Sequence, residues 1–199
     1  MLGIVKEIEI RLFLLPKTSI IMYKIYPEKR YNETLALLNR FATSDENILD
    51  LGVKNPFTEV MLENNFKVIN TTGEDLDYHY THLKNIDATF VTALEILEHL
   101  VNPMEVLRNL PGDKLLASIP MRLWFSPAYR SKTDPRDVHY HEFEDWQFDM
   151  LLEKAGWKII HRHKWTHPTN KIGFRPFLRK ITPRYYAVYA ERIKDFEFK

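Results

Sequence analysis

The sequence contains no cysteine, and this absence excludes several kinds of chemistry. Without thiols the chain has no disulfide framework, no zinc–thiolate site and no thiol nucleophile. It also lacks an apolar run of the roughly 20 residues that a membrane-spanning helix requires. The composition therefore predicts a protein without a membrane span, and because a reducing compartment suits it, we expect it in the cytoplasm.

The chain begins with an apolar stretch, "MLGIVKEIEIRLFLLP". A secretory signal needs an uninterrupted apolar core, and Glu7, Glu9 and Arg11 interrupt this one. We therefore expect the stretch to be part of the mature fold.

What the chain does contain suits one globular domain. It has 199 residues, of which 45% are hydrophobic, enough for one sizeable core. We expect a single domain over residues 1–199, in which residues 1–45 form a helical cover and residues 46–199 a sheet core.

The net charge of +1 hides an uneven distribution. Residues 158–192 carry nine Lys or Arg and one acid, Glu191, which leaves −7 for the rest of the chain (1 − 8 = −7). Such a basic flank attracts phosphates, nucleic acid or anionic lipid, but it is more often solvated surface. We predict no nucleic-acid partner, and the oligomeric state stays open.

Apolar patterns alternate along most of the chain. A helix is predicted over residues 28–42, because Leu35, Leu38 and Phe41 recur at helical spacing. Strands are then predicted at 47–51, 66–71, 87–93 and 114–119, and helices at 57–64, 95–110 and 143–155. This alternation is typical of a parallel sheet with helices on both faces.

The last quarter has a different pattern. Residues 156–165 and 184–193 are both strand-like, and a loop containing Pro and Arg is predicted over residues 166–183. Two strands joined without a crossover helix are most simply antiparallel. The sheet should therefore end in an antiparallel pair.

The turn after the first strand is the place to look for a ligand in such a sheet. It reads Asp50-Leu51-Gly52-Val53-Lys54, followed by Asn55. Gly52 permits a tight turn, and the next helix directs its positive amino end at the loop. Further glycines are missing, and we expect Asn55 to be the residue able to adopt a left-handed conformation.

Three longer segments resemble a known family. They are "FVTALEILEHLVNPMEVLRNL", "GDKLLASIP" and "HYHEFEDWQFDMLLEKAGWKII", and with the first turn they resemble the class I S-adenosylmethionine-dependent methyltransferases, small-molecule (type 11/type 23-like) branch. The resemblance covers about residues 30–193. It implies an α/β, Rossmann-like seven-stranded mixed sheet in the order 3-2-1-4-5-7-6, with strand 7 antiparallel, and methyl transfer to a small-molecule substrate with S-adenosylmethionine as cofactor.

The resemblance also implies which residues bind the cofactor. They follow three strands: Asp50, Gly52 and Val53 after the first, Thr72 and Glu74 after the second, and Ala93, Leu94 and Glu95 at the end of the fourth strand of the family. Thr72 takes the place of the acid that holds the ribose, and Glu74 and Asp75 lie just beyond it.

Two departures from the family pattern oppose cofactor binding. The turn at Val53 has lost its glycines, and the roughly fifteen residues before Asp87 are few for a helix, strand 3 and an adenine loop. The alternative function is therefore a non-catalytic methyltransferase-like binding module with a degenerate cofactor loop, which would bind a partner or an anionic surface through the basic flank.

Three histidines are the candidate catalytic bases: His99, which belongs to the Glu98-His99 pair of the resemblance, His139 and His141. A structural role for His99 as a cap is an equal alternative. No metal site is predicted, because the chain has no cysteine and the histidine pairs have no third ligand at a known spacing.

A long connection follows the strand that ends at Pro120. We predict that residues 122–141 form a mobile lid, which with the loop at 166–183 makes the substrate mouth. Its aromatic residues Trp124, Phe125 and Tyr129 would cover an apolar part of the substrate. The sequence does not identify the methyl acceptor.

Overall fold

The computed structural model describes residues 27–134, 137–168 and 171–194. The chain divides into two compact units, residues 1–36 and 37–199. The first unit is described only from Pro27, where helix α3 (Pro27–Phe41) begins as predicted. The apolar start of the chain, and with it most of the predicted helical cover, lies outside the described residues.

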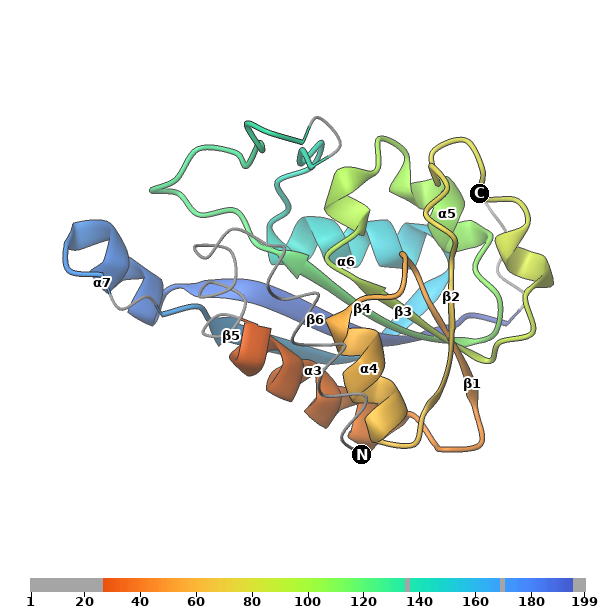
Figure 1. The fold of residues 1–199 in the computed structure, drawn as a ribbon. Helices are drawn as coiled ribbons and strands as arrows, with labels where there is room; N and C mark the ends of the chain where they lie inside the picture. Colours follow the sequence, from red (N-terminus) through yellow and green to blue (C-terminus); the bar gives the residue numbers. More distant parts are fainter. Residues whose placement is uncertain (1–26, 135–136, 169–170, 195–199) are drawn as a thin grey trace. The chain divides into compact units, whose positions relative to one another are not determined.

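The second unit contains a six-stranded sheet in the order β2-β1-β3-β4-β6-β5 (Figure 1). The strands are β1 (Asn47–Asp50), β2 (Lys67–Asn70), β3 (Phe90–Leu94), β4 (Lys114–Pro120), β5 (Trp157–Thr166) and β6 (Pro183–Arg192). The first four are parallel, and β6 is antiparallel to both β4 and β5. The predicted insertion of the last strand between its two neighbours is confirmed.

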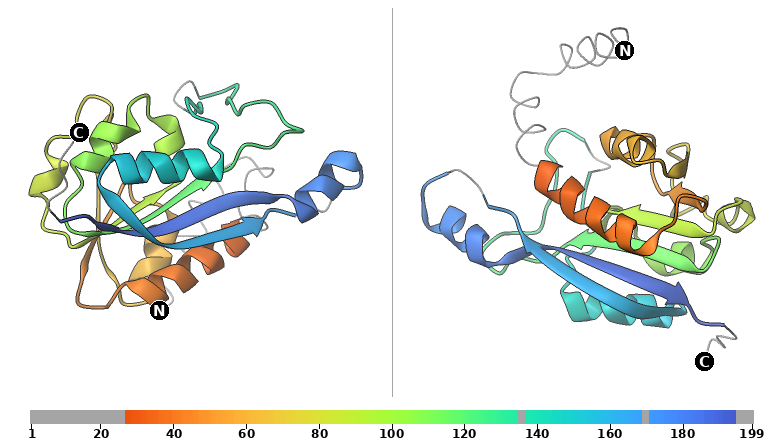
Figure 2. Two further views of the ribbon diagram at one scale, coloured as in Figure 1. Left: turned by 180° about the vertical axis from the view of Figure 1, so that it is seen from behind. Right: turned by 90° about the horizontal axis from the view of Figure 1, so that it is seen from below.

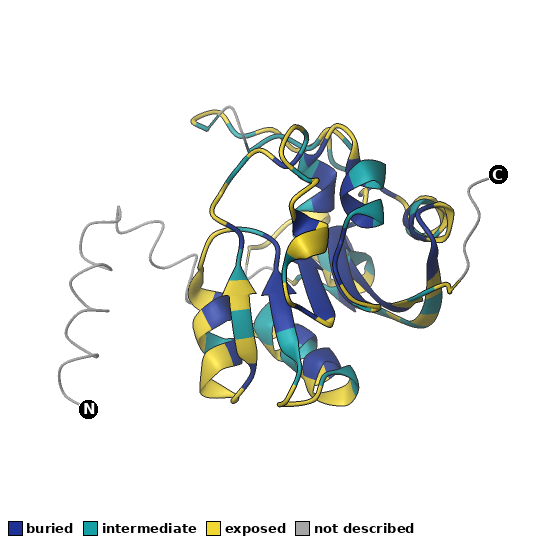
Figure 3. Ribbon diagram, turned by 90° about the vertical axis from the view of Figure 1, so that its right-hand side faces the viewer, coloured by how far each residue is buried: buried dark blue, intermediate teal, exposed yellow. Residues whose placement is uncertain are grey.

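The predicted seven strands are a miscount, because the described residues form six. The missing one is strand 3 of the family order, which would lie beyond β2. Between Asn70 and Phe90 the chain forms only a short 3₁₀ helix, η1 (Leu83–Asn85), held by the buried side chains of Leu76 and Leu83. A parallel strand needs a crossover of a dozen or more residues, and this segment is too short to supply both the crossover and a strand. As a result β2 is an edge strand whose residues are exposed or partly exposed (Figure 3). Ile69 on this strand is 40% exposed.

Helices cover both faces of this sheet. Helix α4 (Pro56–Glu63) lies on one face, and α5 (Pro103–Arg108) and α6 (Asp145–Lys154) lie on the other (Figures 1 and 2). The predicted helix at 95–110 is shorter than expected, because a 3₁₀ helix, η2 (Leu97–His99), precedes α5 and Pro103 sets the start of the α-helix.

The loop predicted at 166–183 contains a helix, α7 (Phe174–Ile181), so that prediction is wrong in part. Gly173, with φ 140°, begins the helix, and Pro176 lies in its first turn. Proline is tolerated there because the first-turn amides have no acceptor within the helix. Pro176 was therefore compatible with a helix.

The central strands carry the core. Strands β3 and β4 are buried along almost their whole length (Figure 3). Their near-continuous apolar sequences follow from this, since a parallel strand covered on both faces has no polar side. The rigid centre of the sheet holds the ends of β1, β3 and β4 in fixed register.

Candidate active site

The predicted cofactor residues meet at one edge of the sheet. Asp50 pairs with Asn70 of β2 and with Thr92 of β3, and Leu94 pairs with Ser118 of β4. The strands are parallel, so their carboxyl ends lie at the same edge, where ligands bind in open α/β sheets. The structure therefore brings together the three groups that follow β1, β2 and β3.

The turn after β1 is closed by residues that replace the missing glycines. Gly52 has φ 118°, and its amide donates to Thr71 Oγ1 at 2.7 Å. Val53 is 55% exposed and lies across the next loop, where a Cβ on Gly73 would be 2.8 Å from Val53 Cγ1. Apart from Gly52 itself and its two chain neighbours, no described residue has a heavy atom within 4 Å of the position that a Cβ on Gly52 would occupy, so a ligand can approach this backbone.

Asn55, which is able to adopt a left-handed conformation, does not do so here. Its φ is −137° and its side chain caps α4, accepting from the amides of Phe57 and Thr58 at 2.9 and 3.2 Å. An asparagine before Pro at the first helical position is a strong N-cap signal, and capping competes with the turn role. Two amides of the helix amino end are therefore already occupied by protein.

Asp50 is buried at the centre of this turn, with 2% of its surface exposed. Its carboxylate accepts from Thr92 Oγ1 at 2.7 Å, from Asn70 Nδ2 at 3.0 Å and from Thr58 Oγ1 at 3.5 Å. Burial raises the pKa of Asp50 to about 6, although these hydrogen bonds oppose the shift. Asp50 thus joins β1, β2, β3 and α4. The position of Asp50 in the sequence did not predict these hydrogen-bond partners.

Thr72 and Glu74, both predicted after β2, contact each other. The amide and hydroxyl of Thr72 each donate to Glu74 Oε2 at 2.8 Å, and His82 Nε2 lies 2.9 Å from the other carboxylate oxygen. Partial burial opposes ionisation, yet the hydrogen bonds from its own backbone and from Thr72 hold the pKa of Glu74 below its usual value. An ionised carboxylate therefore stands at this edge of the sheet.

The end of β3 is strained at Glu95. Its φ is 55°, which is uncommon for a residue other than glycine, and such residues cluster at functional sites. Its amide donates to the Ser118 carbonyl at 3.0 Å, and its Oε1 accepts from Ser118 Oγ at 2.8 Å. Ala93 is buried just before it, and Leu94 is partly exposed. Ser118, a buried polar residue of β4, was not predicted as part of the site.

A second group of side chains follows β3 and includes two of the predicted bases. The rings of His99 and His139 lie edge to face with centroids 4.9 Å apart. His99 Nδ1 lies 3.0 Å from the Val138 carbonyl, and His139 Nδ1 lies 2.9 Å from Glu142 Oε1. Glu98 is buried, and its Oε1 is 3.8 Å from His99 Nε2. Burial lowers the pKa of His139, although Glu142 opposes the shift.

His141, the third predicted base, does not belong to this group. Its Nε2 lies 3.3 Å from the Val101 carbonyl, and its ring stacks on Phe143 with centroids 5.2 Å apart. Its backbone amide and that of Tyr140 both donate to the Glu98 carbonyl, at 3.2 and 2.8 Å. His141 therefore helps to attach the loop, and its Nε2 is engaged with the backbone.

The predicted lid is attached at both ends and exposed between them. Besides these amides, the amide of Arg122 donates to the Phe143 carbonyl at 2.8 Å, and an isolated bridge pairs Arg130 with Val138. Trp124 is 72% exposed. Residues 135–136 of the segment lie outside the described residues.

No family model and no curated protein matches this sequence. Solved structures do resemble it. An Archaeoglobus fulgidus SAM-dependent methyltransferase has 15% identity and a TM-score of 0.58, over 89% of this chain and 100% of the other.

A Burkholderia thailandensis 1,6-didemethyltoxoflavin-N1-methyltransferase, solved with its substrate and S-adenosylhomocysteine, has 14% identity and a TM-score of 0.57, over 87% of this chain and 86% of the other. The [4+2]-cyclase SpnF has 12% identity and a TM-score of 0.54, over 82% and 81%. The likeness to these structures extends over most of this chain, which therefore has the fold of the class I S-adenosylmethionine-dependent methyltransferases.

Proposed function

We propose that the protein is an S-adenosylmethionine-dependent methyltransferase that acts on a small molecule. The observation that carries the proposal is the position of Glu95. This residue, with φ 55°, directly follows β3, the strand next to β1 and its Gly52 turn, and it comes just before the Glu98-His99 pair. A strained acid at a ligand-binding edge indicates a site shaped for a ligand.

The residues at this edge fit the charge of S-adenosylmethionine, which has a sulfonium and an ammonium group. The carboxylate of Glu95 complements these cations, and that of Glu74, which follows β2, would accept from the ribose hydroxyls. Because no described residue beyond its chain neighbours lies within 4 Å of a Cβ position on Gly52, the backbone turn can approach the methionine part. Ala93 and Leu94 line the same end of β3. Asp50, which is buried, acts by holding the turn in place.

When bound, the cofactor supplies an electrophilic methyl group. The acceptor's lone pair forms the new bond to carbon as the C–S bond breaks, and the bond electrons pass to sulfur, which becomes a neutral thioether. The protein aligns the two partners and, for a hydroxyl acceptor, removes its proton. His99 and His139 suit that task through Nε2, because the Nδ1 atom of each is already engaged.

The acceptor would enter between this histidine group and the exposed segment at 122–134. Trp124 and Tyr129, 72% and 44% exposed, offer aromatic surface there. The Burkholderia neighbour was solved with 1,6-didemethyltoxoflavin bound, and this favours a small-molecule acceptor. The absence of cysteine suits a reducing cytoplasm, which we propose as the compartment.

Calorimetry with S-adenosylhomocysteine tests the proposal. The wild-type protein should bind, and ligand at 100 times its dissociation constant should raise stability by about 2.7 kcal/mol. Glu95→Gln should weaken binding roughly tenfold or more, because it removes a charge-assisted hydrogen bond. Glu105→Gln is the matched control, since Glu105 pairs with Arg108 on α5. No heat and no melting shift at millimolar ligand would contradict the enzyme proposal.

The alternative remains a binding module without methyl transfer. It is favoured by the occupied amino end of α4 and by the [4+2]-cyclase among the neighbours, which shows that this fold also hosts other chemistry. A protein that fails to bind S-adenosylhomocysteine and keeps its fold would favour this alternative.

A further inference from the structure

We propose that Glu98, His99 and His139 form a binding site for a divalent first-row transition-metal ion. One carboxylate oxygen and one imidazole nitrogen from each histidine all lie within 4.8 Å of one another. Ligand atoms about 2.1 Å from one ion lie roughly 3 to 3.5 Å apart. Small side-chain rotations are therefore enough to close the site around a metal.

The second nitrogen of each histidine supports this assignment. Metal-binding histidines usually donate the other ring N–H to a carbonyl or carboxylate, which fixes the ring and exposes the remaining lone pair. Here His99 Nδ1 lies 3.0 Å from the Val138 carbonyl and His139 Nδ1 lies 2.9 Å from Glu142 Oε1. Both Nε2 atoms are thereby left as the ligand atoms.

Glu142 is itself held in place, because it also accepts from the Tyr129 amide at 2.8 Å. Glu98 is fixed by its backbone, whose carbonyl accepts from Tyr140 and His141. Two carboxylates, Glu98 and Glu142, therefore lie at or next to the cluster. The positive charge that opposes them is the guanidinium of Arg184. The local charge favours a cation.

Two imidazoles and one carboxylate suit Mn²⁺, Fe²⁺, Co²⁺ or Zn²⁺ and leave coordination positions open for water or a substrate oxygen. The ion would act as a Lewis acid that lowers the pKa of a bound hydroxyl. This use rests on the proposed methyltransferase function, but the binding does not. With a metal present, the two Nε2 atoms serve as ligands and the ion replaces them in activating the acceptor.

The test uses the full chain, freed of metal by chelation and desalting. Binding of Mn²⁺ is measured by the loss of the electron paramagnetic resonance signal of the free ion. Binding of Co²⁺ is measured by visible absorption, and binding of Zn²⁺ by calorimetry. We expect one ion per chain. Glu98→Gln and His139→Ala should weaken binding roughly 100-fold, and Glu142→Gln, which changes only the outer partner, roughly 10-fold.

His79→Ala is the matched control, because His79 is exposed and lies outside the cluster. Melting curves without metal identify any variant that fails to fold, and His99→Gln then replaces it. Wild-type protein that binds none of the three ions, or binding unchanged in Glu98→Gln and His139→Ala, would overturn the proposal. Neither result depends on S-adenosylhomocysteine, so the site and the enzyme function can fail separately.

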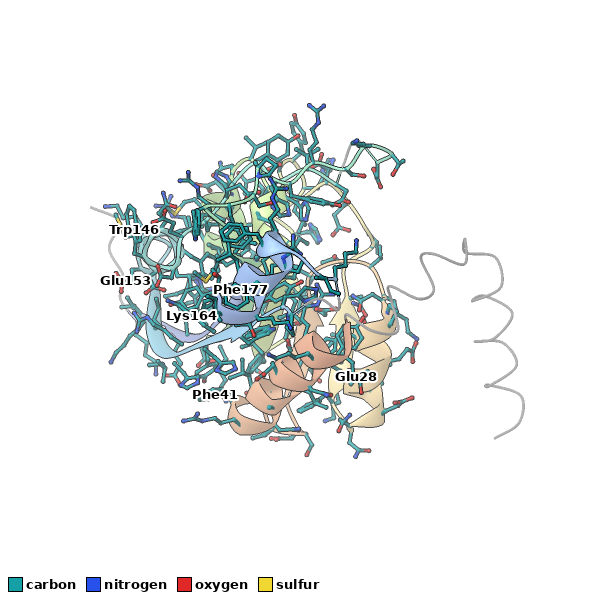
Figure 4. The ribbon with its side chains drawn as sticks, turned by 90° about the vertical axis from the view of Figure 1, so that its left-hand side faces the viewer. Glu28, Phe41, Trp146, Glu153, Lys164 and Phe177 are labelled. Atoms are coloured by element: carbon teal, nitrogen blue, oxygen red, sulfur yellow. The ribbon has the colours of Figure 1, made fainter. Side chains whose placement is uncertain are left out.

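A second and independent observation concerns α7. Phe174, Phe177 and Ile181 recur at helical spacing and are 69%, 59% and 63% exposed, and Ile172 before them is fully exposed. Phe177 is labelled on this helix in Figure 4. Such a cluster on a surface marks an interaction site.

Basic side chains surround these apolar residues. Residues 171–184 contain five Lys or Arg and no acid: Lys171, Arg175, Arg179, Lys180 and Arg184. A helix with exposed aromatic residues on one side and basic residues around them suits the interface of a membrane with anionic lipids. We infer that α7 docks the protein on an anionic membrane surface.

Sedimentation of the full chain with vesicles tests this inference. We expect binding to phosphatidylcholine vesicles that contain phosphatidylserine, little binding without it, and a decrease with salt. Phe174→Ser with Phe177→Ser should reduce the bound fraction roughly tenfold. Met150→Ser on α6 is the control, because Met150 is 59% exposed elsewhere. Absence of binding to the anionic vesicles, which would follow if another part of the chain or a protein covers α7, overturns the inference.

Discussion

The two halves of the candidate site are built in different ways. On the cofactor side, residues 50–86 contain an edge strand, loops and one short 3₁₀ helix. On the histidine side, residues 94–99 leave a buried central strand, and residues 137–143 are attached to them by two backbone hydrogen bonds to Glu98. The first half lacks glycines that the family pattern has after β1. The second half keeps the Glu98-His99 pair of that pattern.

The difference shows that a turn can be closed by other residues than glycine. Thr71 accepts from the Gly52 amide, Asn55 caps the following helix, and Val53 fills the space over Gly73. The backbone amides of Gly52, Phe57 and Thr58 thus have partners inside the protein. On the histidine side, three ligand atoms, one each from Glu98, His99 and His139, lie within 4.8 Å of one another.

The largest expected effect concerns Asp50, which supports the cofactor side. Asp50→Ala leaves the buried donors of Thr92, Asn70 and Thr58 without their acceptor and should lower the free energy of unfolding by about 3 kcal/mol. It should also weaken S-adenosylhomocysteine binding. Urea unfolding and calorimetry measure both.

Asp75→Ala is the control for this change. Asp75 is exposed and accepts from the amide of Asp77 in its own turn, so its loss should cost less than about 1 kcal/mol. If Asp75→Ala weakened binding more than Asp50→Ala, the assignment of the turn to the cofactor would be wrong.

A smaller effect is expected from pH. The pKa of Asp50 is about 6 in the fold against 3.8 as the ordinary value, because burial disfavours its charge. The folded state therefore binds the proton more tightly, and the contribution of Asp50 to stability is present at low pH and is lost as pH rises to about 6. The shift of about 2 pKa units corresponds to roughly 2–3 kcal/mol.

Asp50→Asn isolates this contribution, because the amide does not ionise and none of the hydrogen-bond partners of Asp50 titrates. The stability of the wild type relative to Asp50→Asn should be higher at pH 4 than at pH 7 by that amount, measured by denaturant unfolding. A difference that stays constant, or that has the opposite sign, would show that Asp50 is not desolvated.

Periodicity was sufficient to predict where the central strands lie, since β3 and β4 are buried on both faces and read as apolar runs. The order of the strands came from the family resemblance. Periodicity did not identify α7, where Pro176 resembled a loop signal, nor the absent strand after β2. The hydrogen-bond partners of the site residues were even harder to predict from the sequence. Ser118 and Glu95 come from different strands, and only the register of β3 with β4 places them together. Sequence position can indicate the edge of a sheet, but the contacts across it depend on register and side-chain rotamers.

The smallest effect concerns the segment at 122–141, which borders the histidine side. The predicted mobile lid now has two fixed points, because Tyr140 and His141 donate to the Glu98 carbonyl and Arg122 donates to the Phe143 carbonyl. Amides at these points should exchange slowly with deuterium in the free protein, and those near Trp124 should exchange at least about a hundredfold faster, because stability is not uniform across a fold.

When cofactor and substrate are both bound, closure over them should slow exchange of the outer amides, whereas the fixed points should change little. Hydrogen exchange measured by mass spectrometry, with and without S-adenosylhomocysteine, separates the two parts of the segment. Strong protection along the whole segment in the free protein would identify a packed structural loop. The substrate mouth would then lie elsewhere, because a loop that never opens cannot admit an acceptor to the histidine side, and the exposed Trp124 would need another explanation.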